Sequence, residues 1–196
     1  MIELNQYKNT RWSKDETISF MGSSCLGVDL DQSIKLVIAN RFMDCEFTLI
    51  DGWLRFHPIQ NTQLSYGGQF LSLLSNPLLL IVINLIILFL YWGGYRFYKI
   101  KRKKTTIVVR IIMICGLAGC FCSLIDKIFW GGSLDFLQIP NLFIFDGKDV
   151  YLTLSEVFFV ILALRHNQEI SAREFIRFCI DQFHTRLHQN SVKNKD

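Results

Sequence analysis

Hydrophobic residues gather in long runs along the chain, and charged residues mark the ends of those runs. The clearest run begins at Pro77 and carries no charge before Arg96. About 20 apolar helical residues cross the core of a bilayer, because a helix satisfies its own backbone polar groups where water is absent. The pattern predicts a membrane-spanning helix over residues 77–97. A buried helix of a soluble protein is the alternative.

Two further runs have the length of membrane spans. Residues 105–125 are interrupted only by Arg110, which lies near enough to one end to extend toward the membrane surface. Residues 150–166 are shorter and contain Glu156. We expect both runs to span.

The region over residues 17–39 has helical length but contains Asp29, Asp31 and Lys35. Charges inside a span are costly unless they face protein or a water-filled site, and the i,i+4 spacing lets Asp31 and Lys35 pair on one helix face. We expect a first span here, with an amphipathic surface helix as the alternative.

Basic residues orient the expected helices. Six of them lie between residues 96 and 104, and loops rich in lysine and arginine face the cytoplasm. Four spans then place residues 40–74 and 127–148 outside, and both termini, including the tail 167–196, inside. The whole chain, residues 1–196, forms one integral membrane domain.

Composition supports this assignment. The chain is 51% hydrophobic, and its net charge of +4 lies beside the apolar runs, so we read the charge as a topology signal and expect no nucleic-acid partner. Alternating polar and apolar residues within 41–74 predict short strands on the outer surface. The tail predicts an amphipathic helix on the cytoplasmic surface, with Phe175, Ile176 and Ile180 on its apolar face. We expect no metal or other cofactor.

Four aspartates lie in or beside the second outer loop: Asp126, Asp135, Asp146 and Asp149. Two carboxylates held within a few ångströms share one proton, which leaves one as a base for water and the other as an acid. Asp135 and Asp149 could form such a pair. Capping of helix ends, by Asp149 and Asp126, is the structural alternative.

The motifs around these acids resemble those of the bacterial lipoprotein signal peptidases (signal peptidase II), over roughly residues 11–165. The segment SLIDKIFWGGSLDF is similar to the family's NxxDR, glycine and VxDF motifs, and FDGKD is similar to its FNxAD motif. Asp31 and Lys35 look like the family's DQxxK, and Asn61 looks like the start of its NxGxxF. Order and spacing both fit.

The resemblance implies an all-α membrane fold with four transmembrane helices and a small extracytoplasmic β-cradle. It places the catalytic pair at Asp135 and Asp149. Residues expected to bind substrate or support the pair are Asp31, Lys35, Asn61, Ser123, Asp126, Lys127 and Asp146. The implied substrate is a diacylglyceryl-modified prolipoprotein, cut before its lipidated cysteine.

The chain departs from the family's pattern close to the expected site. Ser123 stands in place of asparagine, Lys127 in place of arginine, Asp146 in place of asparagine and Gln63 in place of glycine. Lysine lacks the planar fork of arginine, and aspartate adds a negative charge. The charge of Asp146 should raise the proton affinity of the pair unless Lys127 or Lys148 approaches it, and we expect a more acidic pH optimum than is usual for the family.

These inferences together predict an intramembrane aspartic endopeptidase of the bacterial cytoplasmic (inner) membrane, monomeric, with its active site near the outer face and membrane lipid around it. A lipoprotein-binding or assembly protein with weakened catalysis on the same fold is the alternative. A membrane scaffold unrelated to lipoproteins is a third possibility.

Overall fold

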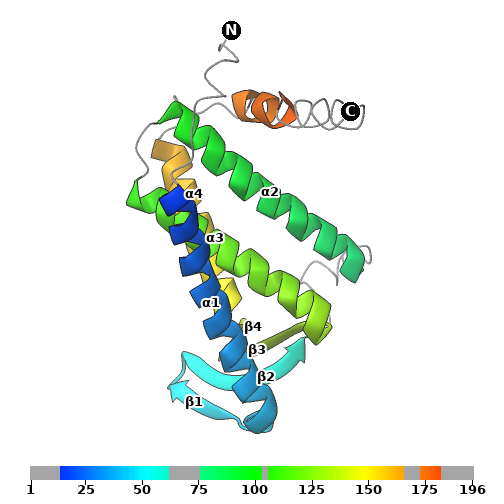
Figure 1. Ribbon diagram of the computed structural model, residues 1–196. Coiled ribbons are helices and arrows are strands. Elements are labelled where there is room, and N and C mark those ends of the chain that lie inside the picture. The colour runs from blue at the N-terminus through cyan, green and yellow to red at the C-terminus, as the bar shows by residue number, and fades with distance from the viewer. Residues whose placement is uncertain (1–13, 62–75, 103–105, 166–172, 182–196) are drawn as a thin grey trace, which may run out of the picture.

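The computed structural model describes residues 14–61, 76–102, 106–165 and 173–181. Its helices are joined at one end to a small sheet (Figure 1). In chain order the elements are α1 (Lys14–Arg41), β1 (Phe47–Ile50), β2 (Leu54–Asn61), α2 (Pro77–Lys101), α3 (Ile107–Ile125), the short π-helix η4 (Asp126–Trp130), β3 (Ser133–Ile139), β4 (Phe143–Phe145) and α4 (Gly147–Arg165). A further helix covers residues 173–181.

Helix α3 is the centre of the bundle, since it contacts α1, α2 and α4. Glycines let its neighbours approach closely. A Cβ atom at Gly119 would lie 2.6 Å from Cγ of Leu152 on α4, and one at Gly27 of α1 would lie 3.2 Å from Cβ of Ala118. Helix α2 runs alongside α3 and diverges from α1 toward its N-terminal end (Figure 1).

The expected tail helix packs on the C-terminal part of α2. Phe97 lies 5.6 Å from both Phe175 and Phe178, measured between ring centroids, and Lys101 forms an ion pair of 2.7 Å with Glu174. Ile176 is exposed. Phe183 and Leu187, which continue the apolar spacing of the tail in the sequence, lie outside the described residues.

The sheet has the antiparallel order β1-β2-β3-β4. Strands β1 and β2 fall where the alternating pattern predicts them. Strands β3 and β4 come from the second outer segment, for which the sequence indicated no strands. Leu134 and Phe136 of β3 pack with Ile38 of α1, so the side chain between them, Asp135, is presented on the other face of the strand.

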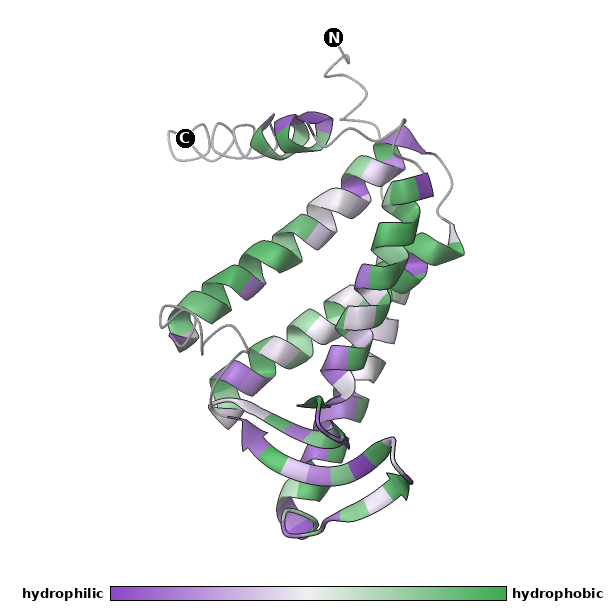
Figure 2. Cartoon of the chain, turned by 180° about the vertical axis from the view of Figure 1, so that it is seen from behind, coloured by the Kyte–Doolittle hydropathy of each residue, from purple (hydrophilic) through white to green (hydrophobic). Residues whose placement is uncertain are grey.

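Two stretches are long and apolar enough to cross a membrane, Leu78–Lys101 and Ile107–Trp130. Hydrophobic positions cover most of α2, while the sheet is rich in hydrophilic ones (Figure 2). Helices α1 and α4 do not pass the same test of length and composition, since each carries several charges. The structure therefore supports a mostly helical fold with a small sheet, and the four-span count stays a prediction.

Candidate active site

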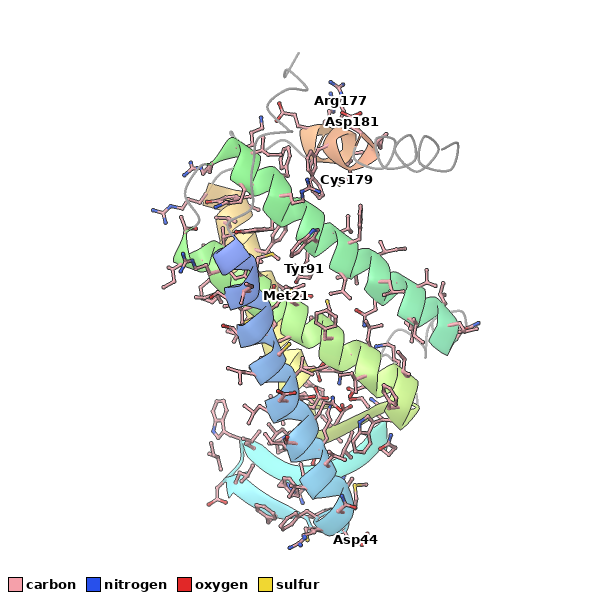
Figure 3. The ribbon with its side chains drawn as sticks, in the orientation of Figure 1. Met21, Asp44, Tyr91, Arg177, Cys179 and Asp181 are labelled. Atoms are coloured by element: carbon pink, nitrogen blue, oxygen red, sulfur yellow. The ribbon has the colours of Figure 1, made fainter. Side chains whose placement is uncertain are left out.

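The two aspartates singled out in the sequence lie together where the sheet meets the helices. Asp135 projects from β3 and Asp149 lies in the first turn of α4. One carboxylate oxygen from each, with one from Asp146, lie within 4.8 Å of one another. In Figure 3, Asp44 marks this sheet end of the molecule, and Arg177 and Cys179 mark the opposite end.

The start of α4 fixes the position of Asp149. The backbone N–H of Asp149 donates to Oδ1 of Asp146 over 3.2 Å, and the backbone N–H of Asp146 donates to Oδ2 of Asp149 over 3.1 Å. This reciprocal pair has the form of a capping box. The capping role considered for Asp149 is therefore real, and it coexists with a place beside Asp135.

Asp135 is buried, and hydrogen-bond donors reach both of its carboxylate oxygens. Ser133, two residues earlier on the same strand face, donates to Oδ1 over 2.7 Å. Nδ2 of Asn61 on β2 donates to Oδ2 over 3.0 Å. The expected contribution of Asn61 thus takes the form of a direct bond to one member of the pair.

Lys35 and Asp31 join the site from α1. The ammonium of Lys35 is fully buried and lies 3.0 Å from Asp31, 2.7 Å from Asp126 and 2.6 Å from Asp146. The expected i,i+4 pairing of Lys35 and Asp31 is present. A Cβ atom at Gly147 would lie 2.7 Å from Oδ1 of Asp31, so a side chain at this position would displace the Asp31 carboxylate.

A second lysine enters the cluster from α4. Nζ of Lys148 lies 2.6 Å from Oδ2 of Asp146, 3.3 Å from Asp126 and 3.6 Å from Oδ1 of Asp135. It also donates a hydrogen bond to Oγ of Ser133. Lys148 and Lys35 therefore compensate the additional negative charge of Asp146.

Lys127 does not approach Asp146 in this way. Its ammonium donates to the backbone oxygen of Ser123 over 3.2 Å and to the Ser123 hydroxyl. The two departures from the family's pattern at these positions thus bond to each other. Lys127 still lines the cavity beside the pair, with its partner Ser123 behind it.

The surroundings give the acids different proton affinities. Burial raises the pKa of Asp149 to about 6, with the negative charges of Asp146 and Asp135 adding to the effect and Lys148 opposing it. Burial alone would also raise the pKa of Asp146, but Lys148 and Lys35 hold it below its ordinary value. Burial alone would lower the pKa of Lys148, yet the surrounding carboxylates raise it. Asp146 and Lys148 therefore stay ionised.

A cavity of about 300 Å³ opens onto the pair. Its lining residues are Asn61, Asp126, Lys127, Gly132, Ser133, Asp135, Phe143, Ile144, Phe145, Lys148 and Asp149. The lining combines charged and polar side chains with the aromatic and aliphatic residues of β4. This combination suits a chain segment that presents both a peptide bond and apolar groups.

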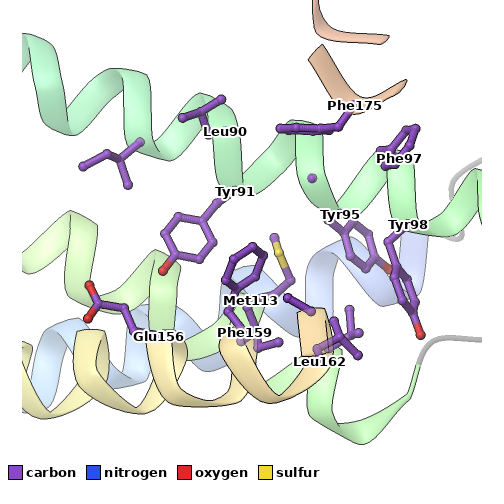
Figure 4. Close-up of a pocket in the computed structure, with 15 residues that line it drawn as sticks. Leu90, Tyr91, Tyr95, Phe97, Tyr98, Met113, Glu156, Phe159, Leu162 and Phe175 are labelled. Carbon is purple, nitrogen blue, oxygen red and sulfur yellow. The ribbon is translucent and has the colours of Figure 1, made fainter. Parts of the chain in front are cut away.

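A second, larger cavity of about 580 Å³ lies among α2, α3 and α4 (Figure 4). Its walls are almost entirely apolar. Glu156 and the hydroxyl of Tyr91 are among its polar groups, and Tyr91 bonds to Ser155 over 2.8 Å. None of the carboxylates described above lines this cavity, so it is separate from the candidate site.

Sequence reasoning missed Ser133. The residue lies two positions before Asp135, and the period of two along a strand places both on one face. That signal could be read only if residues 133–139 were first recognised as a strand. Gln32, named only as part of a motif, also takes part, because its amide donates to Asp126 over 3.2 Å and accepts from the indole N–H of Trp130 over 3.0 Å.

The fold and the site define a helical membrane protein with an acidic cavity enclosed by a small sheet at one end. The sequence model of the family described as Signal peptidase (SPase) II matches residues 24–165. The chain belongs to this family.

Individual relatives agree with that assignment. The lipoprotein signal peptidase of Syntrophus aciditrophicus (strain SB) is 31% identical over 130 residues, which cover 64% of this chain and 77% of the relative. A solved bacterial membrane enzyme has a TM-score of 0.62 at 21% identity, covering 79% of this chain and 92% of that one. Another has a TM-score of 0.57 at 20% identity, covering 74% and 92%. At these identities the structures show a shared fold.

Proposed function

We propose that this protein is an aspartic endopeptidase that removes the signal peptide from diacylglyceryl-modified prolipoproteins. The proposal combines membership of the signal peptidase II family with one geometric observation. Asp135 and Asp149 come from different elements, yet their carboxylate oxygens lie within 4.8 Å of each other at the edge of a cavity.

Hydrolysis by such a pair needs one ionised and one protonated carboxyl group. The ionised carboxylate takes a proton from water as the water oxygen bonds to the peptide carbonyl carbon. The protonated partner gives its proton to the carbonyl oxygen, which yields a tetrahedral diol. The peptide C–N bond then breaks, the nitrogen takes the proton gained from water, and a diol hydroxyl returns its proton to the second carboxylate. The pair ends with one proton, as it began.

The surroundings of the pair supply the remaining groups of the site. Asn61 and Ser133 orient Asp135 by their hydrogen bonds, and Lys127 adds a positive charge at the cavity wall. Lys35, Asp31, Asp126 and Asp146 form the ionic support behind the pair. On this proposal the substrate's acyl chains lie in membrane lipid beside the helices, while the bond to be cut enters the cavity.

We place the protein in the bacterial inner membrane as a monomer with cytoplasmic termini and four spans, over about residues 17–39, 77–97, 105–125 and 150–166. The sheet and the cavity then lie at the outer face. Support comes from the basic segment between α2 and α3 and from the apolar exposed surfaces of α2 and α4. Asp31 and Lys35 of α1 become acceptable in a span because they are buried and because Lys35 pairs with Asp31, Asp126 and Asp146.

The test is conversion of a diacylglyceryl prolipoprotein by the purified protein in detergent or lipid. We expect Asp135→Asn and Asp149→Asn each to reduce kcat by about 100-fold or more, as expected for loss of a general acid or base. Asp51→Asn, which changes an exposed aspartate in the turn between β1 and β2, is the control and should retain full activity. Substrate binding without turnover by the wild-type protein would favour the weakened binding or assembly protein instead.

A further inference from the structure

Lys148 has no role in the chemistry proposed above, yet it faces the carboxylate pair directly. It stands where the family's FNxAD motif has alanine. Its ammonium lies 2.6 Å from Asp146, which stands where that motif has asparagine, and 3.6 Å from Asp135. Two neutral positions of the motif are thus filled here by a pair of opposite charges.

A hydroxyl connects Lys148 to Asp135. Lys148 donates to Oγ of Ser133, so the single proton of that hydroxyl must be donated onward. Three carboxylates are in reach, and the distances are 2.7 Å to Asp135, 3.1 Å to Asp146 and 3.2 Å to Asp126. The shortest of these bonds goes to Asp135.

The two carboxylates of the pair therefore differ in the hydrogen bonds that they accept and in the charge near them. Asp135 accepts hydrogen bonds on both oxygens, from Ser133 and Asn61, and has the ammonium of Lys148 nearby. The bond described for the Asp149 carboxylate comes from the backbone N–H of Asp146. Donors and a positive charge favour the ionised form of a carboxyl group. The proton is more easily kept on Asp149.

The charge of Lys148 also disfavours protonation of Asp149, but of these two acids it is Asp135 that accepts a hydrogen bond from Ser133, the hydroxyl that Lys148 contacts. Other charges around the pair do not cancel this difference. The charged groups of the site are Asp31 and Lys35 from α1, Asp126 and Lys127 from η4, Asp135 from β3, Asp146 before α4, and Lys148 and Asp149 from its first turn. Lys35 is paired with Asp31, Asp126 and Asp146, while Lys127 keeps its charge, donates to Ser123 and forms no ion pair with Asp135 or Asp149 among the described residues. Among the ion pairs of the described residues, the one that reaches Asp135 comes from Lys148.

Building on the proposed function, we propose that Lys148 is a positioning residue that acts through Ser133 to keep Asp135 ionised and to leave the shared proton on Asp149. Asp135 is then the base that takes a proton from water, and Asp149 is the acid that protonates the carbonyl oxygen. The negative charge of Asp146 offsets the positive charge of Lys148, so the two residues together leave the net charge of the cluster unchanged.

The first test is the acidic limb of kcat/KM against pH, where the base gains its proton. Lys148→Met keeps the length of the side chain without its charge and should move this limb up by about one pH unit or more. Lys148→Arg should restore it. Ser133→Ala, which removes only the hydroxyl, should move the limb in the same direction.

Asp146→Asn provides the matched opposite change, because asparagine still caps a helix. Loss of its charge leaves Lys148 less opposed, so the acidic limb should move down. The double variant Asp146→Asn/Lys148→Met should return close to the wild-type limb. A limb that stays in place while Lys148→Met and Ser133→Ala lower kcat equally at every pH would show a structural role only and overturn the proposal.

A second measurement needs no turnover. Infrared spectroscopy detects the C=O band of a protonated carboxyl group. We expect the band of the pair to be lost in Asp149→Asn and kept in Asp135→Asn, and the reverse result would overturn the proposal even if Lys148→Met failed to fold. If the wild-type protein cleaves no prolipoprotein, the proposed function fails, and the infrared result still decides where the proton lies.

Discussion

At the residue scale, the site is a set of charges in which the lysines are shared among several carboxylates. Lys35 contacts three aspartates and Lys148 contacts Asp146, Asp126 and Asp135. Burial strengthens each of these electrostatic contacts, and it makes an unpaired charge costly in folding free energy. Asp149 stands at the edge of the cluster, where burial raises its proton affinity.

This position of Asp149 predicts the basic limb of activity. Its pKa of about 6 means that the group holds a proton below that pH and loses it above. Since the acid of the pair must be protonated, kcat/KM should fall as pH rises through about 6. The measurement is prolipoprotein conversion across the pH range, with Asp51→Asn as control. A rate that still rises between about pH 6 and 8 would contradict the assignment.

Removal of Lys35 should cost more stability than removal of any exposed lysine. Lys35→Met leaves Asp31, Asp126 and Asp146 without a buried partner, and we expect a loss of about 3–5 kcal/mol in the free energy of unfolding. Lys101→Met, which breaks the partly exposed pair with Glu174, is the control and should cost under about 1 kcal/mol. Unfolding in detergent measures both, and equal losses would argue against a supporting ionic role.

The carboxylate pair could be predicted from sequence because motif order and spacing carry it. The hydrogen bonds and ion pairs around the carboxylate pair could not be predicted from sequence. Whether Lys127 or Lys148 pairs with Asp146 depends on how η4 and the first turn of α4 orient the two side chains, and spacing along the chain leaves both possibilities open. Ser133 was missed for the same kind of reason, since its contact with Asp135 requires a strand that the sequence did not reveal.

At the scale of elements, the sheet and the glycine contacts bring the aspartates together. Strand β3 follows Gly131 and Gly132 and precedes Pro140, so the segment reads as a loop until β2 supplies its hydrogen-bonding partner. Helix α1 was hard to assign because its charges lower its hydropathy. Two of those charges, Asp31 and Lys35, are buried in a cluster with Asp126 and Asp146 from distant parts of the chain, which no local pattern can show.

Close packing of α3 against α4 predicts sensitivity at Gly119. A Cβ there would lie 2.6 Å from Cγ and 3.3 Å from the backbone N of Leu152, so α4 must shift. We expect Gly119→Ala to destabilise the protein by about 1–3 kcal/mol. Gly22→Ala on α1, where a Cβ meets nothing within 4 Å, is the control and should be neutral or slightly stabilising. Equal unfolding temperatures for the two variants would refute the packing argument.

At the scale of the whole molecule, polarity divides the protein into two ends. The acidic cavity and the sheet lie at one end, and the helix 173–181 packs near the basic end of α2. The apolar runs and the flanking basic residues predicted this division before any contact was known. Length and composition do not decide how many helices cross the bilayer, because α1 and α4 carry charges that a span accepts only where protein buries them.

Cysteine thiols near the two ends of the molecule should react with a thiol reagent from opposite sides of the membrane. Cys45, in the turn after α1, should be labelled by a membrane-impermeant thiol reagent on intact spheroplasts. A cysteine introduced as Lys104→Cys, between α2 and α3, should be labelled only after the membrane is opened. Mass spectrometry of the labelled peptides identifies each site. Labelling of both positions from one side would exclude the four-span arrangement.

The two carboxylates of the pair belong to elements that experience the membrane differently. Asp149 is part of α4, which on the proposed topology is anchored in the hydrocarbon layer, whereas Asp135 is part of a sheet above it. A helix adjusts its tilt when the bilayer becomes thicker or thinner than its apolar length. On the proposed topology and chemistry, we therefore expect lipid acyl-chain length to change the gap across which water is activated, and membrane thickness to affect the cleavage rate.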